Sequence, residues 1–171
     1  VMTSLITARE SIPLSQALQD LELNKQSSLV LMGPTACGNT GAKDIAALLE
    51  RNKTLTSLML VDTALDHDGI AMLALALNKN RTLRELYLGL NVIGRVGACS
   101  LANVLKRNTS ICLLDLSGCQ IGDEGVEALA NMLHSNSTLS SINLRLNNVN
   151  DSGAVNIANA LKVNKDLVYL E

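Results

Sequence analysis

Residues 83–110 read LRELYLGLNVIGRVGACSLANVLKRNTS, and residues 111–138 read ICLLDLSGCQIGDEGVEALANMLHSNST. The two stretches align without a gap. Residues 55–82 and residues 139–166 align on them with the same 28-residue period, and residues 27–54 form a weaker copy. Repetition at a fixed period of about 20 to 50 residues is typical of solenoid proteins, in which each unit packs only on its neighbours. The sequence therefore predicts a repeat protein.

The repeats divide the whole chain. We expect one domain over residues 1–171, made of an N-terminal half repeat (1–26), five repeats (27–54, 55–82, 83–110, 111–138 and 139–166) and the start of a further repeat (167–171). Asn recurs at Asn24, Asn52, Asn80, Asn108, Asn136 and Asn164, and Gly recurs at Gly41, Gly69, Gly97, Gly125 and Gly153. Pro13 lies one period before Gly41, and no insertion or deletion interrupts the spacing from Pro13 to Asn164.

Each repeat contains two hydrophobic periods. The first part reads L-x-x-L-x-L, as in Leu83, Leu86 and Leu88, and this alternation predicts a short strand with one buried face. After the recurring Gly, apolar residues fall at i, i+3, i+4 and i+7, which predicts an amphipathic helix. We expect the recurring Asn to end each helix in the left-handed conformation that Asn tolerates. One further position recurs after each strand, and we call it the ladder position: it is occupied by Thr35, Thr63, Asn91, Cys119 and Asn147.

This combined pattern resembles the ribonuclease-inhibitor-like class of leucine-rich repeats over residues 10 to 171. The resemblance implies an α/β fold, a curved solenoid (horseshoe) with a parallel sheet on the concave side and helices on the convex side. The curvature also follows from packing, since strands lie ~4.8 Å apart and helix axes ~8–10 Å apart. Ribonuclease inhibitor itself alternates two repeat types and is rich in Cys, whereas one type repeats here. The single type is similar to the repeats of NOD-like receptors.

The composition excludes several classes of protein. Hydrophobic residues make up 47% of the chain and aromatic residues 1%, with two Tyr, no Phe and no Trp. The net charge of −2 lacks the basic excess of nucleic-acid-binding proteins. No apolar run reaches the ~18 residues of a membrane span, and the N-terminus lacks the layout of a signal peptide. The four Cys have no metal-ligand spacing and are expected to be reduced and buried. We therefore expect a cytoplasmic protein that binds neither nucleic acid nor membrane.

The residues between the leucines of L-x-x-L-x-L are expected to form three outward columns on the concave face. The first column is Leu29, Ser57, Glu85, Leu113, Ser141 and Tyr169. The second is Leu31, Met59, Tyr87, Asp115, Asn143 and Glu171. The third is Gly33, Val61, Gly89, Ser117 and Arg145. The N-terminal half of this face is apolar, and an exposed apolar cluster is typical of a protein-binding surface.

We therefore predict a non-enzymatic protein-interaction module, part of a larger scaffold, sensor or regulatory protein. The predicted protein-binding residues are Leu29, Leu31, Met59, Val61, Glu85, Tyr87, Leu113, Asp115, Asn143, Arg145 and Tyr169. Two other interpretations of the patch stay open: residues 1–8 or upstream chain could cover Leu29 and Leu31, or the patch could be a surface without function. The alternative function is a GTPase-activating protein resembling the Ran-specific leucine-rich-repeat type, with Asp115, Asn143 and Arg145 as its polar cluster.

The last residues supply a strand without a following helix. Terminal repeats need a polar cap, and an uncovered edge strand invites pairing. We expect either a fragment of a longer repeat array or end-to-end self-association through the C-terminal strand. The partner protein itself is not identified by the sequence.

No motif predicts a cofactor, a metal site or catalysis. Residues 33–40 have the G-x-x-x-x-G spacing of a phosphate loop, but Asn39 stands where the essential Lys belongs. His67 and His134 occupy unrelated repeat positions. The acidic pairs Asp66/Asp68 and Asp123/Glu124 precede expected helices, where negative charge suits the helix dipole. The glycosylation sequons at the recurring Asn follow from the repeat period. Glycosylation there, or at the separate sequon of Asn150, would need a secretory route, which the sequence does not support.

Overall fold

The computed structural model describes residues 14–23 and 26–171 as alternating helices and strands. The helices are α1 (Leu14–Glu22), α2 (Gly38–Leu49), α3 (His67–Leu77), α4 (Gly94–Leu105), α5 (Gly122–Leu133) and α6 (Asp151–Val163). The strands are β1 (Ser28–Met32), β2 (Ser57–Val61), β3 (Glu85–Tyr87), β4 (Leu113–Asp115), β5 (Ser141–Asn143) and β6 (Tyr169–Leu170). Pro13, Asn24 and much of the N-terminal half repeat (1–26) lie outside the described residues.

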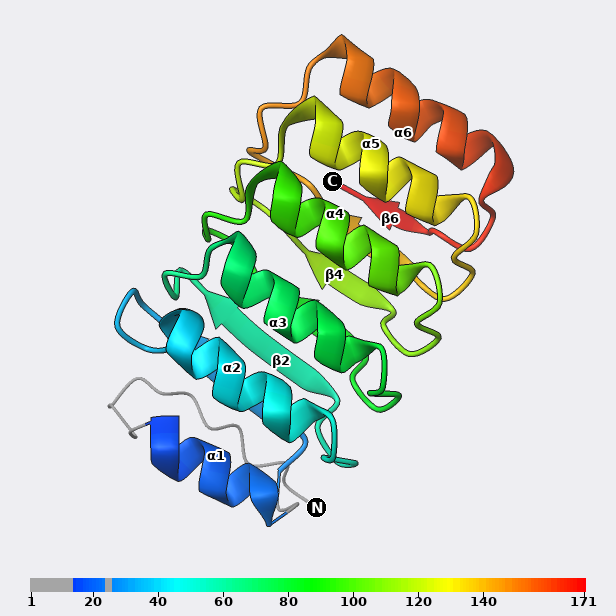
Figure 1. Cartoon of the computed structure of the whole chain (residues 1–171). Helices are drawn as coiled ribbons and strands as arrows, with labels where there is room; N and C mark the ends of the chain where they lie inside the picture. Colours follow the sequence, from blue (N-terminus) through cyan, green and yellow to red (C-terminus); the bar gives the residue numbers. More distant parts are fainter. Residues whose placement is uncertain (1–13, 24–25) are drawn as a thin grey trace.

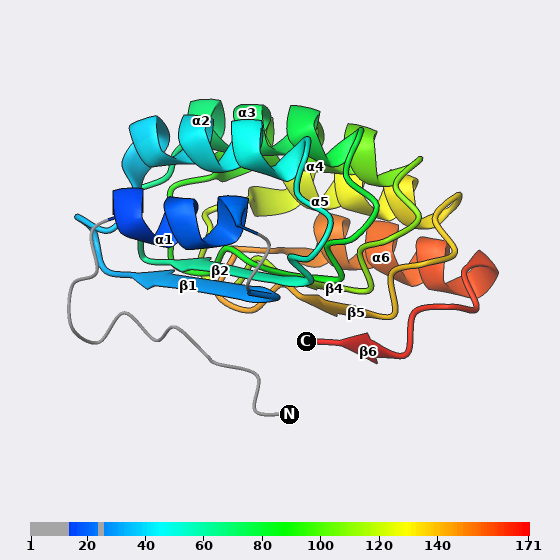
Figure 2. The ribbon, with the colours of Figure 1, turned by 90° about the horizontal axis from the view of Figure 1, so that it is seen from below.

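The strands form one parallel sheet in the order β1-β2-β3-β4-β5-β6, so each strand pairs with the strands of the neighbouring repeats. The helices lie side by side along the same direction (Figure 1), and Figure 2 shows them in one layer with the sheet in the other. This arrangement confirms the predicted α/β solenoid with a parallel sheet. Within the described residues, none of the helices combines the length and apolar character needed to cross a membrane.

The core lies between the two layers and is aliphatic. Leu86 and Leu114 at the centres of their strands are at most 1% exposed, and so are Leu101 and Leu129 on the apolar faces of α4 and α5. They belong to one continuous cluster along the stack. Each inward position receives the same aliphatic shape from repeat to repeat, which allows identical units to pack at high density.

The strand register of the first repeat differs from the prediction. Leu29 pairs with Leu58 and Leu31 with Leu60, so β1 is displaced by one residue from the 28-residue spacing that the other strands keep. Leu29 and Leu31 are therefore buried (0% and 3% exposed), and their assignment to the concave face was wrong. A shift of one residue exchanges the two faces of a strand. It places two Leu in the core and turns Val30 and Met32 outward.

The ladder position organises the turns that follow the strands. Asn91 Nδ2 donates to the carbonyl oxygens of Leu60 (2.6 Å) and Leu88 (2.8 Å), while its Oδ1 accepts from the backbone N–H groups of Thr63 and Leu65 (both 3.0 Å). Asn147 makes the equivalent bonds two repeats further on, and Cys119, in the repeat between them, donates its thiol to Leu88 O. Thr35 was expected in this ladder but is exposed, because the displacement of β1 by one residue takes Thr35 out of register with Thr63.

A second set of Asn side chains joins the helix ends. Asn80 Nδ2 donates to Leu49 O (2.8 Å) in the preceding repeat, and Asn80 Oδ1 accepts from the backbone N–H of Thr82 and Leu83. Asn52, Asn108, Asn136 and Asn164 make equivalent bonds. None of these five residues has a positive φ, so the expected left-handed ending was wrong. Asn recurs because its amide satisfies buried backbone groups of two repeats at once.

The four cysteines have free thiols. Cys119 is buried, as expected, whereas Cys37, Cys99 and Cys112 are only partly buried. Burial raises the pKa of the Cys37 thiol to about 11, with a smaller contribution from Asp44, and burial also raises the pKa of Cys119 to about 11. Both thiols are therefore protonated at neutral pH and behave as small apolar side chains.

Candidate protein-binding face

The outward columns of the concave face are clear once the register of β1 is corrected. Ser28, Val30 and Met32 pair with Ser57, Met59 and Val61. Met59 in turn pairs with Tyr87, and Tyr87 with Asp115. Val30 and Met32 are the residues that sequence analysis missed. The sequence did contain a signal for the correct register: Leu29 and Leu31 match the inward Leu of the other repeats better than Val30 and Met32 do.

Apolar side chains gather on β1 to β4, and we call this group the concave patch: Val30, Met32, Met59, Val61, Tyr87 and Leu113. Met32 is 56% exposed, whereas Val30 is only 9% exposed. The other four members are partly buried. Since soluble proteins rarely expose contiguous apolar surface without a use, this patch is the strongest candidate for a binding surface.

Two carboxylates outside the concave patch, those of Glu85 and Asp115, flank its Tyr87. Tyr87 Oη donates a long hydrogen bond of 3.4 Å to Glu85 Oε2, and burial, with the charge of Glu85 second, raises the pKa of the tyrosine. Asp115 Oδ1 accepts from the backbone N–H of Ser117 (2.8 Å). Among the described residues, neither Glu85 nor Asp115 forms an ion pair within 4.0 Å. The centre of the face is thus an aromatic anchor between two negative charges.

The C-terminal part of the face is polar, as expected. Asn143 Oδ1 accepts from the backbone N–H of Arg145 (3.0 Å), and Arg145 Nη1 lies 3.1 Å from Glu171 Oε1. Tyr169 is 50% exposed. The polar cluster of the GTPase-activating alternative, Asp115, Asn143 and Arg145, thus lies along β4, β5 and the next turn. That alternative stays a prediction, which stimulated hydrolysis of GTP by a panel of small GTPases would test.

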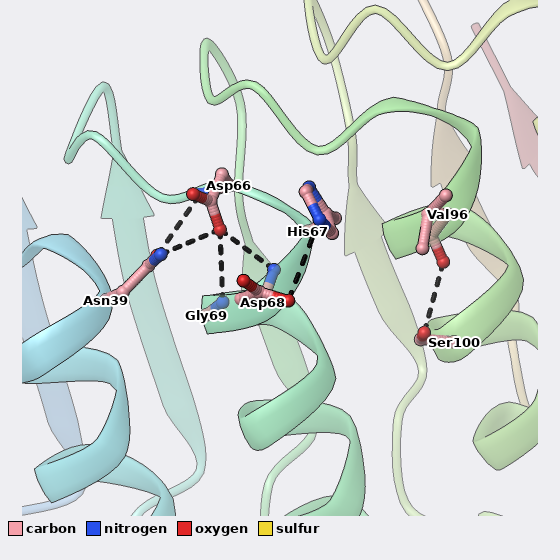
Figure 3. Close-up of polar contacts among 7 residues, drawn as sticks. All are labelled: Asn39, Asp66, His67, Asp68, Gly69, Val96 and Ser100. Carbon is pink, nitrogen blue, oxygen red and sulfur yellow. Dashed lines mark hydrogen bonds and ion pairs between the residues drawn. The ribbon is translucent and has the colours of Figure 1, made fainter.

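Three of the residues considered for catalysis, Asp66, His67 and Asp68, lie elsewhere, at the start of α3 (Figure 3). His67 Nε2 lies 3.6 Å from Asp68 Oδ1, and both side chains are more than half exposed. The hydroxyl of Ser100, on the neighbouring α4, donates to Val96 O (3.1 Å). Hydrogen bonding between a base and a nucleophile is the usual sign of nucleophilic catalysis, and His67 forms none with Ser100 in this cluster. Within the described residues, no group of three or more His, Cys, Asp or Glu side chains could hold a metal ion.

The acidic residues lie at helix starts, as predicted: Asp66 is the N-cap of α3, and Asp123 lies in the first turn of α5. Asp66 Oδ1 accepts from the backbone N–H of Asp68 (2.8 Å) and from Asn39 Nδ2 of the preceding helix (2.7 Å), as Figure 3 shows. Asp123 Oδ1 accepts from the backbone N–H of Asn150 (2.8 Å), one repeat further on. These carboxylates join successive repeats at their helix starts. His134 Nδ1 lies 2.9 Å from Ala130 O at the end of α5, where a helix-end contact was expected.

Acid is expected to weaken the cap at Asp66. The hydrogen bond from Asn39 is the main reason that the pKa of Asp66 is below its usual value, followed by the backbone N–H groups of Asp68 and Gly69. A carboxyl group whose pKa is lower in the folded than in the unfolded protein stabilises the fold at pH values above the unfolded-state pKa. This stabilisation is lost as the pH falls through the folded-state pKa. The stability difference between the wild type and Asp66→Asn should therefore shrink from pH 7 to pH 2.5 in urea titrations. A constant difference would contradict the assignment.

Three segments of the chain, residues 79–102, 107–130 and 135–158, match the family model described as Leucine Rich repeat. These segments are leucine-rich repeats. The match covers three consecutive units of the 28-residue period and confirms the resemblance found in the sequence, since helices and parallel strands alternate as in ribonuclease-inhibitor-like leucine-rich repeats. None of the curated proteins compared with the chain gives a significant match.

Solved structures share the fold of these leucine-rich repeats. A structure titled leiomodin-1 Actin-Binding Site 2 superimposes with a TM-score of 0.77 at 21% identity, covering 92% of this chain and 91% of that one. The tropomodulin C-terminal domain of Caenorhabditis elegans superimposes with a TM-score of 0.73 at 12% identity, covering 87% and 91%. At these identities the likeness establishes the fold.

Proposed function

We propose that this chain is a non-enzymatic module that binds a protein partner through the concave face of its leucine-rich repeats. The concave patch carries this proposal, because it combines exposed Met32 with Met59, Val61 and the aromatic anchor Tyr87 on adjacent strands. Tyr and Met are enriched in protein interfaces, and Tyr is frequent among the residues whose truncation costs most affinity. The free thiols of the four cysteines fit a reducing, cytoplasmic location, which is part of the proposal.

The kind of partner follows from the charges on this face. Glu85 and Asp115 flank Tyr87 without a cationic partner among the described residues, so the partner should offer an apolar contact next to Lys or Arg. Electrostatic complementarity of this kind mainly accelerates association. Actin is the first probe we would use, because a leiomodin-1 structure of the same fold is titled as an actin-binding site.

Truncating the anchor is expected to weaken binding without unfolding the protein. The double variant Tyr87→Ala, Met59→Ala should bind monomeric actin at least about tenfold more weakly in isothermal titration calorimetry, since such contacts contribute about 1–2 kcal/mol each. Its thermal transition should change little, because both side chains are partly exposed. Val163→Ala on α6, outside the concave face, is the matched control and should bind as the wild type does.

The possible outcomes test the choice of actin as partner and the choice of the concave face as binding surface separately. If wild type does not bind actin, actin is rejected as the partner, and the same variants are then compared in quantitative capture from cytosolic extract. If the double variant retains every partner that the wild type captures, the concave face is not the binding surface and the proposal fails.

A further inference from the structure

The outward face of α3 differs from that of the other helices. Leu75 is 66% exposed and Met72 is 37% exposed. The equivalents of Leu75 in the other repeats are Ala47, Asn103, Asn131 and Asn159, and those of Met72 are Asp44, Ser100, Ala128 and Asn156. Packing of the repeats therefore does not require a large apolar side chain at either position. The two side chains form an exposed apolar surface that belongs to α3 alone.

A groove lies beside Leu75 in the helical layer of the stack. It has a volume of about 380 Å³ and lies between α3 and α4, which are neighbours in Figure 1. Residues 69–78 and residues 96–105, which form most of α3 and α4, include no charged side chain. We use the name helix-layer patch for Met72 together with the groove residues Ala71, Ala74, Leu75, Asn103, Val104 and Arg107. Figure 2 shows the helical layer on the other side of the molecule from the sheet, which carries the concave patch.

The groove ends at a cation that lacks the partner of its equivalents. Arg107 occupies a position at which two earlier repeats form an ion pair with the preceding helix: Arg51 with Glu22 (2.8 Å) and Lys79 with Glu50 (2.9 Å). For Arg107, the preceding repeat has Asn78 in place of that carboxylate. Within the described part of the chain, Arg107 forms no ion pair within 4.0 Å. A carboxylate from another molecule can therefore pair with it.

An anion lies at the opposite end of α3. The side chain of Asp68 is 72% exposed, and the ionisable group beside it is the neighbouring His67, at 3.6 Å. Asp68 lies four residues before Met72, and Arg107 lies four residues after the position of α4 that corresponds to Leu75. Four residues are about one helical turn. The patch thus has a negative charge one turn before Met72 and a positive charge one turn beyond the level of Leu75.

This order of charges makes the patch complementary to itself. When the α3 helices of two copies lie antiparallel, with Met72 of each opposite Leu75 of the other, Asp68 of each copy lies level with Arg107 of the other. Both apolar contacts and both ion pairs then share one two-fold axis, which is the commonest symmetry of homodimers. Antiparallel packing also brings opposite ends of the two helix dipoles together.

We propose that the helix-layer patch binds the same patch of a second copy of this chain, in an antiparallel dimer of α3 helices. The groove beside Leu75 receives Met72 of the second copy, and Arg107 pairs with its Asp68. The contact is smaller than a standard interface of about 800 Å² per partner, so the dimer is weak, with half of the chains associated at roughly 0.1 mM. The proposal goes beyond the proposed function, since this patch shares no residue with the concave patch.

Sedimentation equilibrium of the full chain tests the dimer between about 0.01 and 1 mM. Leu75→Asn introduces the residue that α4, α5 and α6 have at this position, so the fold should be retained. We expect it to weaken dimerisation at least about tenfold, because each dimer loses two buried Leu side chains. Val155→Asn changes an exposed apolar residue of α6 and is the matched control. It should dimerise within about twofold of the wild type.

Exchanging the two charges tests the antiparallel arrangement. Asp68→Lys and Arg107→Glu should each weaken dimerisation at least about threefold, because like charges then face each other twice in every dimer. The double variant Asp68→Lys, Arg107→Glu restores opposite charges at the same two places. Its dimerisation should return to within about twofold of the wild type, which a general effect of surface charge would not produce.

Three results would overturn the proposal. The first is a wild type that stays monomeric up to about 1 mM, and the second is Leu75→Asn dimerising as the wild type does. The third is a double charge variant that dimerises no better than the single variants. The concave-face variant Tyr87→Ala, Met59→Ala should dimerise normally. Loss of the dimer in that variant would place the contact on the sheet and would reject the helix-layer patch, whereas failure to bind a partner protein would leave the dimer unaffected.

Discussion

Replacing Asn91 with Leu is expected to lower the free energy of unfolding by about 4 kcal/mol. The side-chain amide of Asn91 is buried, and it bonds backbone groups of two repeats: its Oδ1 accepts from Thr63 N and Leu65 N, and its Nδ2 donates to Leu60 O. Leu has a similar volume but leaves both N–H groups without a partner. Each buried, unsatisfied group costs about 1–3 kcal/mol. For a chain of this size the midpoint of thermal unfolding should fall by roughly 10 °C.

Two controls separate the ladder from a general effect of losing an amide. Asn103→Leu changes an exposed Asn on α4 and should alter the stability by less than about 0.5 kcal/mol. Asn91→Cys imitates Cys119, which keeps one bond to a carbonyl of the preceding repeat, so it should cost less than Asn91→Leu. If Asn91→Leu and Asn103→Leu had equal effects in denaturant titrations, the amide ladder would not stabilise the stack.

The regular part of this fold was predictable because one spacing repeats. A strand, a turn and a helix must recur wherever Leu, Asn and Gly recur, so the element order, the parallel sheet and the inward residues from Leu58 onward follow from the sequence. The prediction failed at β1, where strict spacing competes with burial. Placing Leu29 and Leu31 in the core displaces the strand by one residue relative to the recurring Gly. A prediction from the 28-residue spacing alone does not take into account the free energy gained by burying these two leucines.

The candidate sites were less predictable than the fold. Met59, Val61 and Tyr87 were assigned correctly to the outward columns, because their repeats keep the period. Val30 and Met32 were missed through the displaced strand. The partner cannot be derived from any of these residues, since one repeat fold supports many functions.

The recurring Gly is expected to be as critical as the ladder. Gly125→Val should destabilise the chain by about 3 kcal/mol, because the new Cβ would contact Ile121 Cγ2 and would lie 3.1 Å from Ala98 Cβ and 3.3 Å from Arg95 Cα. Forcing extra atoms between packed helices costs about 1–3 kcal/mol. Here α5 would have to move away from α4, and the hydrogen bonds between β4 and its neighbours limit how far that repeat can shift.

Gly94→Ala is the matched control for the Gly125 variant. Gly94 has a φ of 59° and no atom within 4 Å of an added Cβ, so its replacement adds backbone strain without a collision. The left-handed conformation costs an L-residue about 1–2 kcal/mol. Urea titrations should therefore rank Gly125→Val as more damaging than Gly94→Ala. The reverse order would mean that the close approach of α4 and α5 is not what makes Gly125 intolerant of a side chain.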